Sequence, residues 1–146
     1  KYENNELINK YGIENILIIS SLVEKEAKNN TDKGNIASVI FNRLDKKMRL
    51  QIDATVITAI TEGQYKLNRP LTYSDLLIKH PYNTYQFNGL PPGMISYVGP
   101  DTINIVLQNP KSDYLFYFYN ENKEKHIFSK NFNEHKTKLN AYRKKS

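Results

Sequence analysis

Apolar residues recur at helical spacing along the first half of the chain. This spacing predicts a helix over residues 13–28 and a second helix over residues 32–46. Thr31 or Asp32 is expected to cap the second helix. Its apolar stripe is formed by Ile36, Val39, Ile40 and Leu44.

Shorter elements are predicted after residue 46. They are an extended segment over 48–56 that leads into a helix to about residue 61, a helix over 71–80, and a helix from Pro100 to about Gln108. Thr72 and Asp75 have the spacing of a capping box, with Asp in place of the usual Glu.

The last third of the chain changes pattern. The aromatic run YLFYFYN, residues 114–120, predicts a strand, and residues 125–129 are expected to pair with it as a hairpin. A basic helix is predicted over residues 131–145. The expected fold class is therefore α+β: one helix-dominated domain, residues 1–146, with a small antiparallel hairpin.

Residues 80–100 read HPYNTYQFNGLPPGMISYVGP and show almost no regular periodicity. They hold four prolines and three glycines, which interrupt helices and strands. We expect a long ordered loop here, and long ordered loops within compact domains are commonly functional.

Composition narrows the class of protein. A length of 146 residues, 39% of them hydrophobic and 25% charged, suits one globular domain. The absence of cysteine excludes disulfides and thiolate metal sites. The three histidines are scattered, with no HxxxH pair, so we expect no metal site.

The net charge of +6 comes from the end of the chain. Residues 1–122 contain 13 basic and 13 acidic residues, whereas residues 123–146 contain eight basic residues and two acidic ones. We interpret this tail as a solvated helix, although such charge could also meet a polyanion. Without a recognisable nucleic-acid-binding module, no nucleic acid partner is expected.

The stretch SSLVEKEAKNN, residues 20–30, holds two glutamates. Glu24 lies one turn before Lys28, the order that favours a surface ion pair, so we expect Glu24 to be solvated. Glu26 lies in the apolar stripe with Ile19, Leu22 and Val23.

The apolar setting of Glu26 has two interpretations. A carboxyl group that is buried without a cation keeps its proton to higher pH, as a general acid must. Alternatively, Glu26 forms a buried ion pair with a structural role. Arg43 also lies on an apolar helix face, so we expect it to have an anionic partner, either Asp53 or Glu26, and a supporting role.

Three segments resemble one known family. SSLVEKEA, IASVIFNRLDKKMRLQIDATV and PYNTYQFNGLPPGMI are similar, in order and spacing, to the catalytic domain of the YceG-like (MltG) endolytic murein transglycosylases. The later stretches HIFS and NEHK also fit, so the resemblance covers about residues 17–140. It implies a cleft like that of lysozyme.

The resemblance implies an activity. The second glutamate of the family's E-K-E motif, here Glu26, would be the catalytic acid that cleaves peptidoglycan glycan strands between N-acetylmuramic acid and N-acetylglucosamine. The product would carry a 1,6-anhydro ring. A single carboxyl group suffices because the nucleophile is the C6 hydroxyl of the same sugar.

Other motif positions are expected to line the cleft. Amide and hydroxyl groups suit sugar hydroxyls, and tyrosine rings suit the apolar faces of pyranoses. The candidates are Asn42, Gln51, Tyr82, Asn83, Thr84 and Tyr85. Asn83 and Thr84 could equally serve as caps within the loop. Asp53 is expected to support Arg43 or a helix N-terminus.

Two alternative functions stay open. One is a non-catalytic glycan-binding domain, and the other is a muramidase that hydrolyses with Glu26 and Asp53. The family has also been labelled aminodeoxychorismate lyase. That activity needs pyridoxal phosphate, and the chain lacks a glycine-rich phosphate loop beside a candidate Schiff-base lysine, so we expect no cofactor.

The resemblance also implies a location and partners. Family members carry an N-terminal transmembrane helix and a LysM-like domain, neither of which lies in these residues. We expect a single-pass protein whose catalytic domain lies outside the cytoplasmic membrane, near the cell-wall synthesis machinery. The chain departs from the family pattern at Lys47, where glycine is common, at Ala54, where proline is usual, and at residues 96–98.

Overall fold

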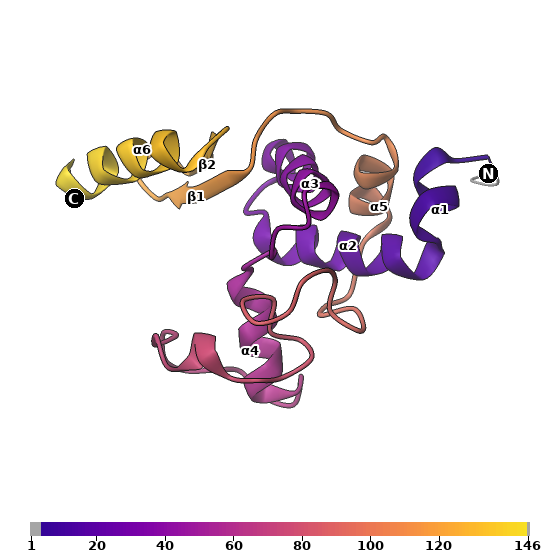
Figure 1. The fold of residues 1–146 in the computed structure, drawn as a ribbon, viewed down its shortest axis with the longest axis horizontal. Helices are drawn as coiled ribbons and strands as arrows, with labels where there is room; N and C mark the ends of the chain where they lie inside the picture. Colours follow the sequence, from indigo (N-terminus) through magenta and orange to yellow (C-terminus); the bar gives the residue numbers. More distant parts are fainter. Residues whose placement is uncertain (1–3, 146) are drawn as a thin grey trace.

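Helix α2 is the centre of the structure, a computed structural model that describes residues 4–145. The elements are α1 (Glu6–Tyr11), α2 (Ile13–Glu26), α3 (Asn30–Asp45), α4 (Asp53–Thr61), a 3-10 turn η1 (Asp75–Leu77), α5 (Pro100–Leu107), β1 (Phe116–Asn120), β2 (Lys125–Ser129) and α6 (Phe132–Lys145). Figure 1 shows α1, α3 and α5 grouped around α2, with α4 below and the hairpin with α6 to one side.

The core forms where apolar stripes of three helices meet. Ile16, Ile19, Leu22 and Val23 of α2 are fully buried. They pack in one cluster with buried residues of α3 and α5, among them Ile36, Ile40 and Val106. Each such side chain contributes about 1.5–3 kcal/mol on burial, so this cluster fixes α2 firmly.

The predicted first and second helices are confirmed, with corrections at their ends. The cap of α3 is Asn29, whose Oδ1 accepts from the backbone N–H of Asp32 at 3.1 Å. The expectation of Thr31 or Asp32 as the cap is therefore wrong. The short helix α1 was not predicted; Asn5 caps it by accepting from Leu7 and Ile8.

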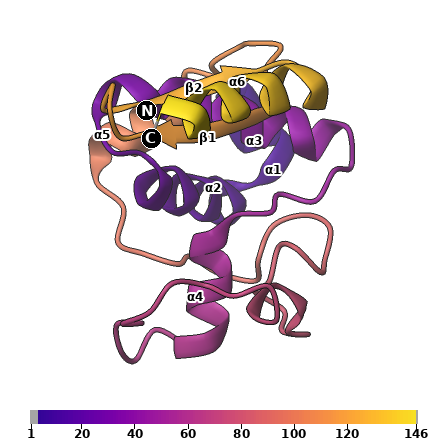
Figure 2. The same ribbon diagram turned by 90° about the vertical axis from the view of Figure 1, so that its left-hand side faces the viewer.

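The predicted hairpin is confirmed. Strands β1 and β2 are antiparallel, with Tyr117 opposite Phe128 and Tyr119 opposite His126. Figure 2 shows α6 lying along this hairpin. No residue of α6 from 132 to 144 is fully buried, which agrees with a basic helix that is largely solvated.

The predicted helix over 71–80 is reduced to the single 3-10 turn η1. The capping box itself is present: the N–H of Thr72 donates to Asp75 Oδ2 at 2.7 Å, and the N–H of Asp75 donates to Thr72 Oγ1 at 3.2 Å. Pro81 disfavours helical geometry at the residue before it, which limits any helix here. Residues 78–99 then form the predicted long loop, without helix or strand.

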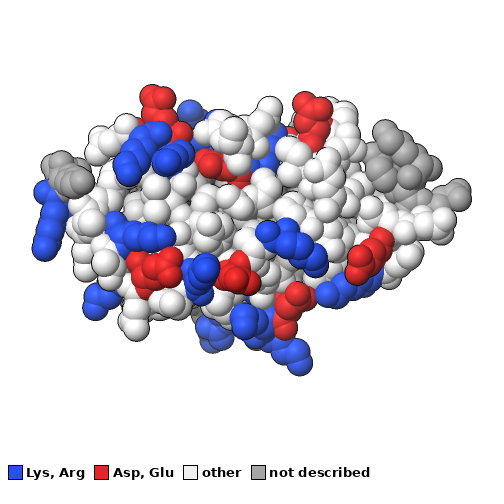
Figure 3. All heavy atoms as spheres, turned by 90° about the horizontal axis from the view of Figure 1, so that it is seen from above, with Lys and Arg blue, Asp and Glu red and all other residues white. Residues whose placement is uncertain are grey.

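These elements confirm the predicted class, a helix-dominated α+β domain with one two-stranded sheet. The predicted domain of residues 1–146 includes residues 1–3 and 146, which lie outside the described residues. Across residues 4–145, no helix is both long and apolar enough to cross a membrane. On the face drawn in Figure 3, acidic and basic side chains are interspersed.

The two departures within the second motif fall at special backbone positions. Lys47 has φ of 58°, in the left-handed region that favours glycine. Ala54 lies in the first turn of α4, where proline is tolerated because its missing N–H has no helical partner. The local geometry thus explains why glycine and proline suit these two positions.

We predict that Lys47→Gly raises the free energy of unfolding by up to about 1 kcal/mol, because glycine relieves the left-handed strain. The neighbouring Lys46→Gly is the matched control. Lys46 has φ of −88°, so glycine there only adds entropy to the unfolded chain and should be neutral or destabilising. Urea unfolding of both variants measures the difference, and equal effects would contradict this explanation.

Candidate active site

Glu26 is the last residue of α2, and its side chain is half-buried. The buried residues Leu22 and Val23 precede it by one turn and carry it to the edge of the core. Its Oε1 accepts a hydrogen bond from the Tyr117 hydroxyl of β1 at 2.7 Å. Within residues 4–145, Glu26 makes no ion pair, so the structure favours the interpretation as an acid over a buried ion pair.

Burial raises the pKa of Glu26 above its ordinary value, because the carboxylate loses hydration. The hydrogen bond from Tyr117 opposes this effect by stabilising the charged form, and the negative charge of Asp53 adds to it. The positive charge of Lys28 lowers the pKa to a smaller extent. Desolvation dominates, so Glu26 holds its proton to higher pH than an exposed glutamate does.

Glu24 was expected to be a solvated residue paired with Lys28, and this expectation is wrong. Its Oε1 accepts from the backbone N–H of Gly99 at 3.0 Å and from Thr102 Oγ1 at 3.1 Å. Its Oε2 lies 3.5 Å from Lys33 Nζ. The hydrogen bond from Gly99 is the main cause that lowers the pKa of Glu24, so the two glutamates have opposite environments.

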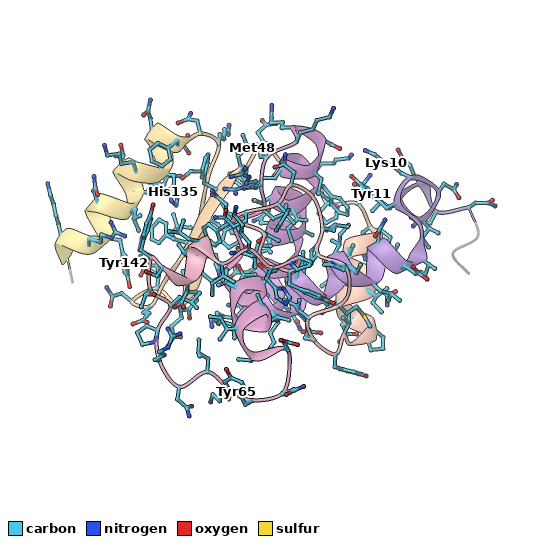
Figure 4. The ribbon with its side chains drawn as sticks, turned by 60° about the horizontal axis from the view of Figure 1, so that its bottom comes forward. Lys10, Tyr11, Met48, Tyr65, His135 and Tyr142 are labelled. Atoms are coloured by element: carbon cyan, nitrogen blue, oxygen red, sulfur yellow. The ribbon has the colours of Figure 1, made fainter. Side chains whose placement is uncertain are left out.

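Glu26 lies where two cavities meet. One, of about 380 Å³, is bounded mainly by the hairpin and the segment before α4. The other, of about 670 Å³, is bounded by α4 and the residues that follow it, including Tyr65, which Figure 4 labels. Both cavities are lined by Glu26, Lys28 and Asp53, so together they form a groove that passes the carboxyl group.

The walls of this groove come from the loop over residues 80–98 and from strand β1. The loop over residues 80–98 supplies Tyr85 to the first cavity and Ile95 to the second. The opposite wall of the first cavity comes from Tyr117, Phe118 and Tyr119 of β1, which the motifs did not indicate.

Arg43 was expected to pair with an acid, and this expectation is wrong. Its Nε donates to the carbonyl of Leu115 at 2.8 Å, and its Nη1 donates to the carbonyls of Arg49 at 2.9 Å and Leu50 at 3.2 Å. The guanidinium also lies 5.0 Å from the centre of the Phe116 ring. Arg43 thus fixes the start of the hairpin against the segment before α4.

Asp53 and Tyr85 meet at the groove. The Tyr85 hydroxyl donates to Asp53 Oδ1 at 2.6 Å. Burial, together with Asp53, raises the pKa of Tyr85 above its ordinary value. Gln51 lies in the same wall with φ of 52°, a left-handed conformation that a non-glycine residue seldom adopts.

Asn83 and Thr84 hold the loop and do not line the groove. Asn83 is fully buried, and its Nδ2 donates to the carbonyls of Leu76 and Ile78. Thr84 Oγ1 accepts from the N–H of Ile52 at 2.9 Å and pairs with Thr55 Oγ1 at 2.8 Å. These contacts favour the role of caps over substrate contact for both residues.

Asn42 and Tyr82 also lie away from Glu26. Asn42 Nδ2 donates to the carbonyls of Ser112 and Tyr114, and its side chain borders a separate cavity. Tyr82 borders another cavity, where a Cβ on Gly93 would approach its hydroxyl to 2.7 Å. Of the six predicted lining residues, the structure therefore brings only Gln51 and Tyr85 to the groove.

The sequence did not single out the hairpin residues of the site, among them Tyr117 and His126. Alternation along a strand places Tyr117 and Tyr119 on one face, but it does not say which face meets Glu26. His126 is buried, and its Nδ1 lies 2.7 Å from Asp32 Oδ2. In the described part of the chain, no three His, Asp or Glu side chains are grouped so that they could hold a metal ion.

Comparison with known proteins places this site in a family. The model of the YceG-like family matches residues 1–141. The chain belongs to the YceG-like family. A Bacillus subtilis relative named endolytic murein transglycosylase is 40% identical over 141 residues, which are 97% of this chain and 38% of the relative.

Other relatives match the chain in sequence and in fold. An endolytic murein transglycosylase of Streptococcus pneumoniae is 34% identical over 126 residues, 84% of this chain and 22% of that protein. The crystal structure of a yceG-like protein from Listeria monocytogenes is 44% identical and superposes with a TM-score of 0.82, covering 93% of this chain and 43% of that one. This chain thus spans less than half the length of these relatives.

Two substitutions should move the pKa of Glu26 in opposite directions. Tyr117→Phe removes the donor that stabilises the carboxylate, so the pKa should rise further. Asp53→Asn removes a neighbouring negative charge, so the pKa should fall. Titration of the carboxyl carbon by NMR measures both.

Asp45→Asn is the control, because Asp45 pairs with Lys10 at the surface and does not line the groove. It should leave the titration of Glu26 unchanged. Shifts of the same sign in Tyr117→Phe and Asp53→Asn would contradict the described electrostatics.

Proposed function

We propose that this chain is the catalytic domain of an endolytic lytic transglycosylase. It cleaves peptidoglycan glycan strands between N-acetylmuramic acid and N-acetylglucosamine and leaves 1,6-anhydro ends. The observation that carries the proposal is one carboxyl group with a raised pKa in an open groove. The names of the relatives from B. subtilis and S. pneumoniae support the same activity.

Glu26 acts first as an acid and then as a base. Its proton passes to the glycosidic oxygen as the bond to C1 of the sugar breaks. The carboxylate then takes the proton of the C6 hydroxyl, whose oxygen bonds to C1 and closes the anhydro ring. The Tyr117 hydroxyl, 2.7 Å from Oε1, holds the carboxyl group in place and stabilises the charged form between these two steps.

The groove suits internal cleavage of a strand. Because cavities lie on both sides of Glu26, sugar units bind on both sides of the bond that breaks. Tyr85 and Tyr119 in one cavity and Tyr65 in the other offer aromatic surface to pyranose rings. A glycan strand therefore spans the whole groove.

Asp53 favours a second candidate, a muramidase. It lines both cavities with Glu26, and a pair of carboxyl groups is what a hydrolase uses to activate water or form a covalent intermediate. Asp53 is already bound to the Tyr85 hydroxyl, so we assign it to the support of Tyr85. The products separate the two functions, because hydrolysis leaves reducing ends and transglycosylation leaves anhydro ends.

The proposal extends to the cellular setting. Substrate strands are those of nascent peptidoglycan, and the protein acts beside the cell-wall synthesis machinery. A membrane anchor upstream of this domain would hold it at the outer face of the cytoplasmic membrane, where these strands form. Family membership supports these points, and localising the full-length protein tests them.

Glu26→Gln should abolish glycan cleavage while the fold persists, because glutamine cannot donate the proton. The loss should be at least about 100-fold, the size of a general acid–base contribution. Mass spectrometry of digested glycan strands measures both the yield and the type of end. Glu14→Gln, an exposed glutamate on the same helix, is the control and should cleave as the unmodified chain does. Unchanged cleavage by Glu26→Gln would sink the proposal, and reducing ends would favour the muramidase.

The same variant should be more stable than the unmodified chain near neutral pH. The pKa of Glu26 is raised on folding, so its contribution to stability is present at low pH and is lost as pH rises through the folded-state pKa. Glutamine does not ionise and avoids this loss. The difference in Tm should therefore vanish below about pH 4 and grow above it. A difference in Tm that is independent of pH would contradict the buried acid.

A further inference from the structure

Asp32 and His126 form a buried pair that the mechanism above does not use. Asp32 lies in the first turn of α3 and His126 lies in β2, and both side chains are almost fully buried. His126 Nδ1 lies 2.7 Å from Asp32 Oδ2, and the backbone N–H of His126 donates to the same oxygen at 3.1 Å. The pair joins the hairpin to the helical core across 94 residues of sequence.

The contacts of Asp32 indicate which nitrogen of the His126 ring carries the proton. A carboxylate oxygen accepts hydrogen bonds, and here it already accepts one from the backbone. The ring therefore donates from Nδ1–H, and in the neutral ring Nε2 carries a lone pair. A carboxylate that fixes one tautomer in this way leaves the second nitrogen with a defined role.

The second nitrogen, Nε2, is on a ring that lines the groove. His126 lines the same cavity as Glu26. The rings of Tyr117 and Tyr119 lie 5.4 and 5.1 Å from the imidazole and fix its orientation. Within residues 4–145, Nε2 has no hydrogen-bond partner, and it is not among the unpartnered atoms that are sealed from solvent.

We propose that His126 is a substrate-positioning residue, whose Nε2 accepts a hydrogen bond from a hydroxyl or acetamido N–H group of the sugar bound between Glu26 and the hairpin. Asp32 acts through His126 by keeping Nε2 free to accept. This inference rests on the proposed function and adds a specificity contact to it. A bound sugar that lacks a donor at this point is held less well.

Binding tests this role without cleavage. Variants are made in the Glu26→Gln chain, and calorimetry measures the Kd for a peptidoglycan glycan oligosaccharide. His126→Asn keeps an amide N–H that reaches Asp32 but places nothing at Nε2, so the Kd should rise about tenfold, the effect of one hydrogen bond. His126→Gln places an amide oxygen near Nε2 and should recover part of that loss. His80→Asn is the control, because His80 lines neither cavity of the groove.

The source of the donor is found by repeating the titration with an oligosaccharide whose acetamido nitrogens are N-methylated and therefore carry no N–H. The effect of His126→Asn disappears if the donor is the acetamido N–H, and it persists if the donor is a hydroxyl. Equal affinity of the His126→Asn variant and its parent for both oligosaccharides overturns the proposal and leaves a structural pair.

A second measurement does not depend on how a variant folds. Nitrogen NMR of histidine-labelled, unmodified protein should show His126 protonated at Nδ1 and bare at Nε2; the opposite tautomer overturns the proposal. Loss of cleavage in Glu26→Gln with no effect of His126→Asn rejects this inference alone. Glycan binding that depends on His126, in a chain that never cleaves, rejects the enzyme and keeps the contact.

Discussion

The candidate site depends on how the last turn of α2 is held. That turn follows fully buried residues and would fray at an exposed helix end, because its carbonyl groups lack helical partners. Glu24 prevents this by binding the N–H of Gly99 and the hydroxyl of Thr102 at the start of α5, and by pairing with Lys33 of α3. These contacts join α2, α3 and α5 at Glu24, two residues before Glu26. The residue that supports this turn and the proposed acid lie in one short segment of sequence.

At this end of α2, Glu24 and Glu26 differ in the direction in which their surroundings shift the pKa. Glu24 is surrounded by donors and a cation, so it remains charged; Glu26 has lost water and gained one phenolic donor, so it retains its proton. The two identical side chains thus have opposite protonation preferences, because positions two residues apart on a helix face different surroundings. The groove then needs only shape and hydrogen-bonding groups, which the aromatic hairpin and the loop before α5 provide.

The sequence pattern predicted most of the helices, the hairpin and the position of Glu26, because these follow from contacts between near neighbours in sequence; it missed α1 and overestimated the helix over residues 71–80. It misplaced Glu24, whose partners lie 75 and 78 residues away. The sequence pattern also predicted an acidic partner for Arg43. The guanidinium instead donates to backbone carbonyls, and because every residue has one, the sequence does not reveal these acceptors. Motif similarity identified Asn83 and Thr84 as important, but only the structure distinguishes residues that hold a loop from those that face a groove. Tyr117 and His126 were not predicted, because alternation along a strand assigns residues to two faces but does not show which helix either face contacts.

The hydrogen bond between Tyr117 and Glu26 spans 91 residues of sequence. Contacts of such separation form slowly, because closing a long loop costs chain entropy, and they require both segments to be present. During synthesis, Glu26 leaves the ribosome long before the strand that encloses it, and until then it is an ordinary solvated acid on a short helix. The carboxyl group gains its unusual proton affinity when the hairpin docks. A nascent or truncated chain therefore lacks the raised pKa on which the proposed catalysis depends, and this property appears together with the finished fold.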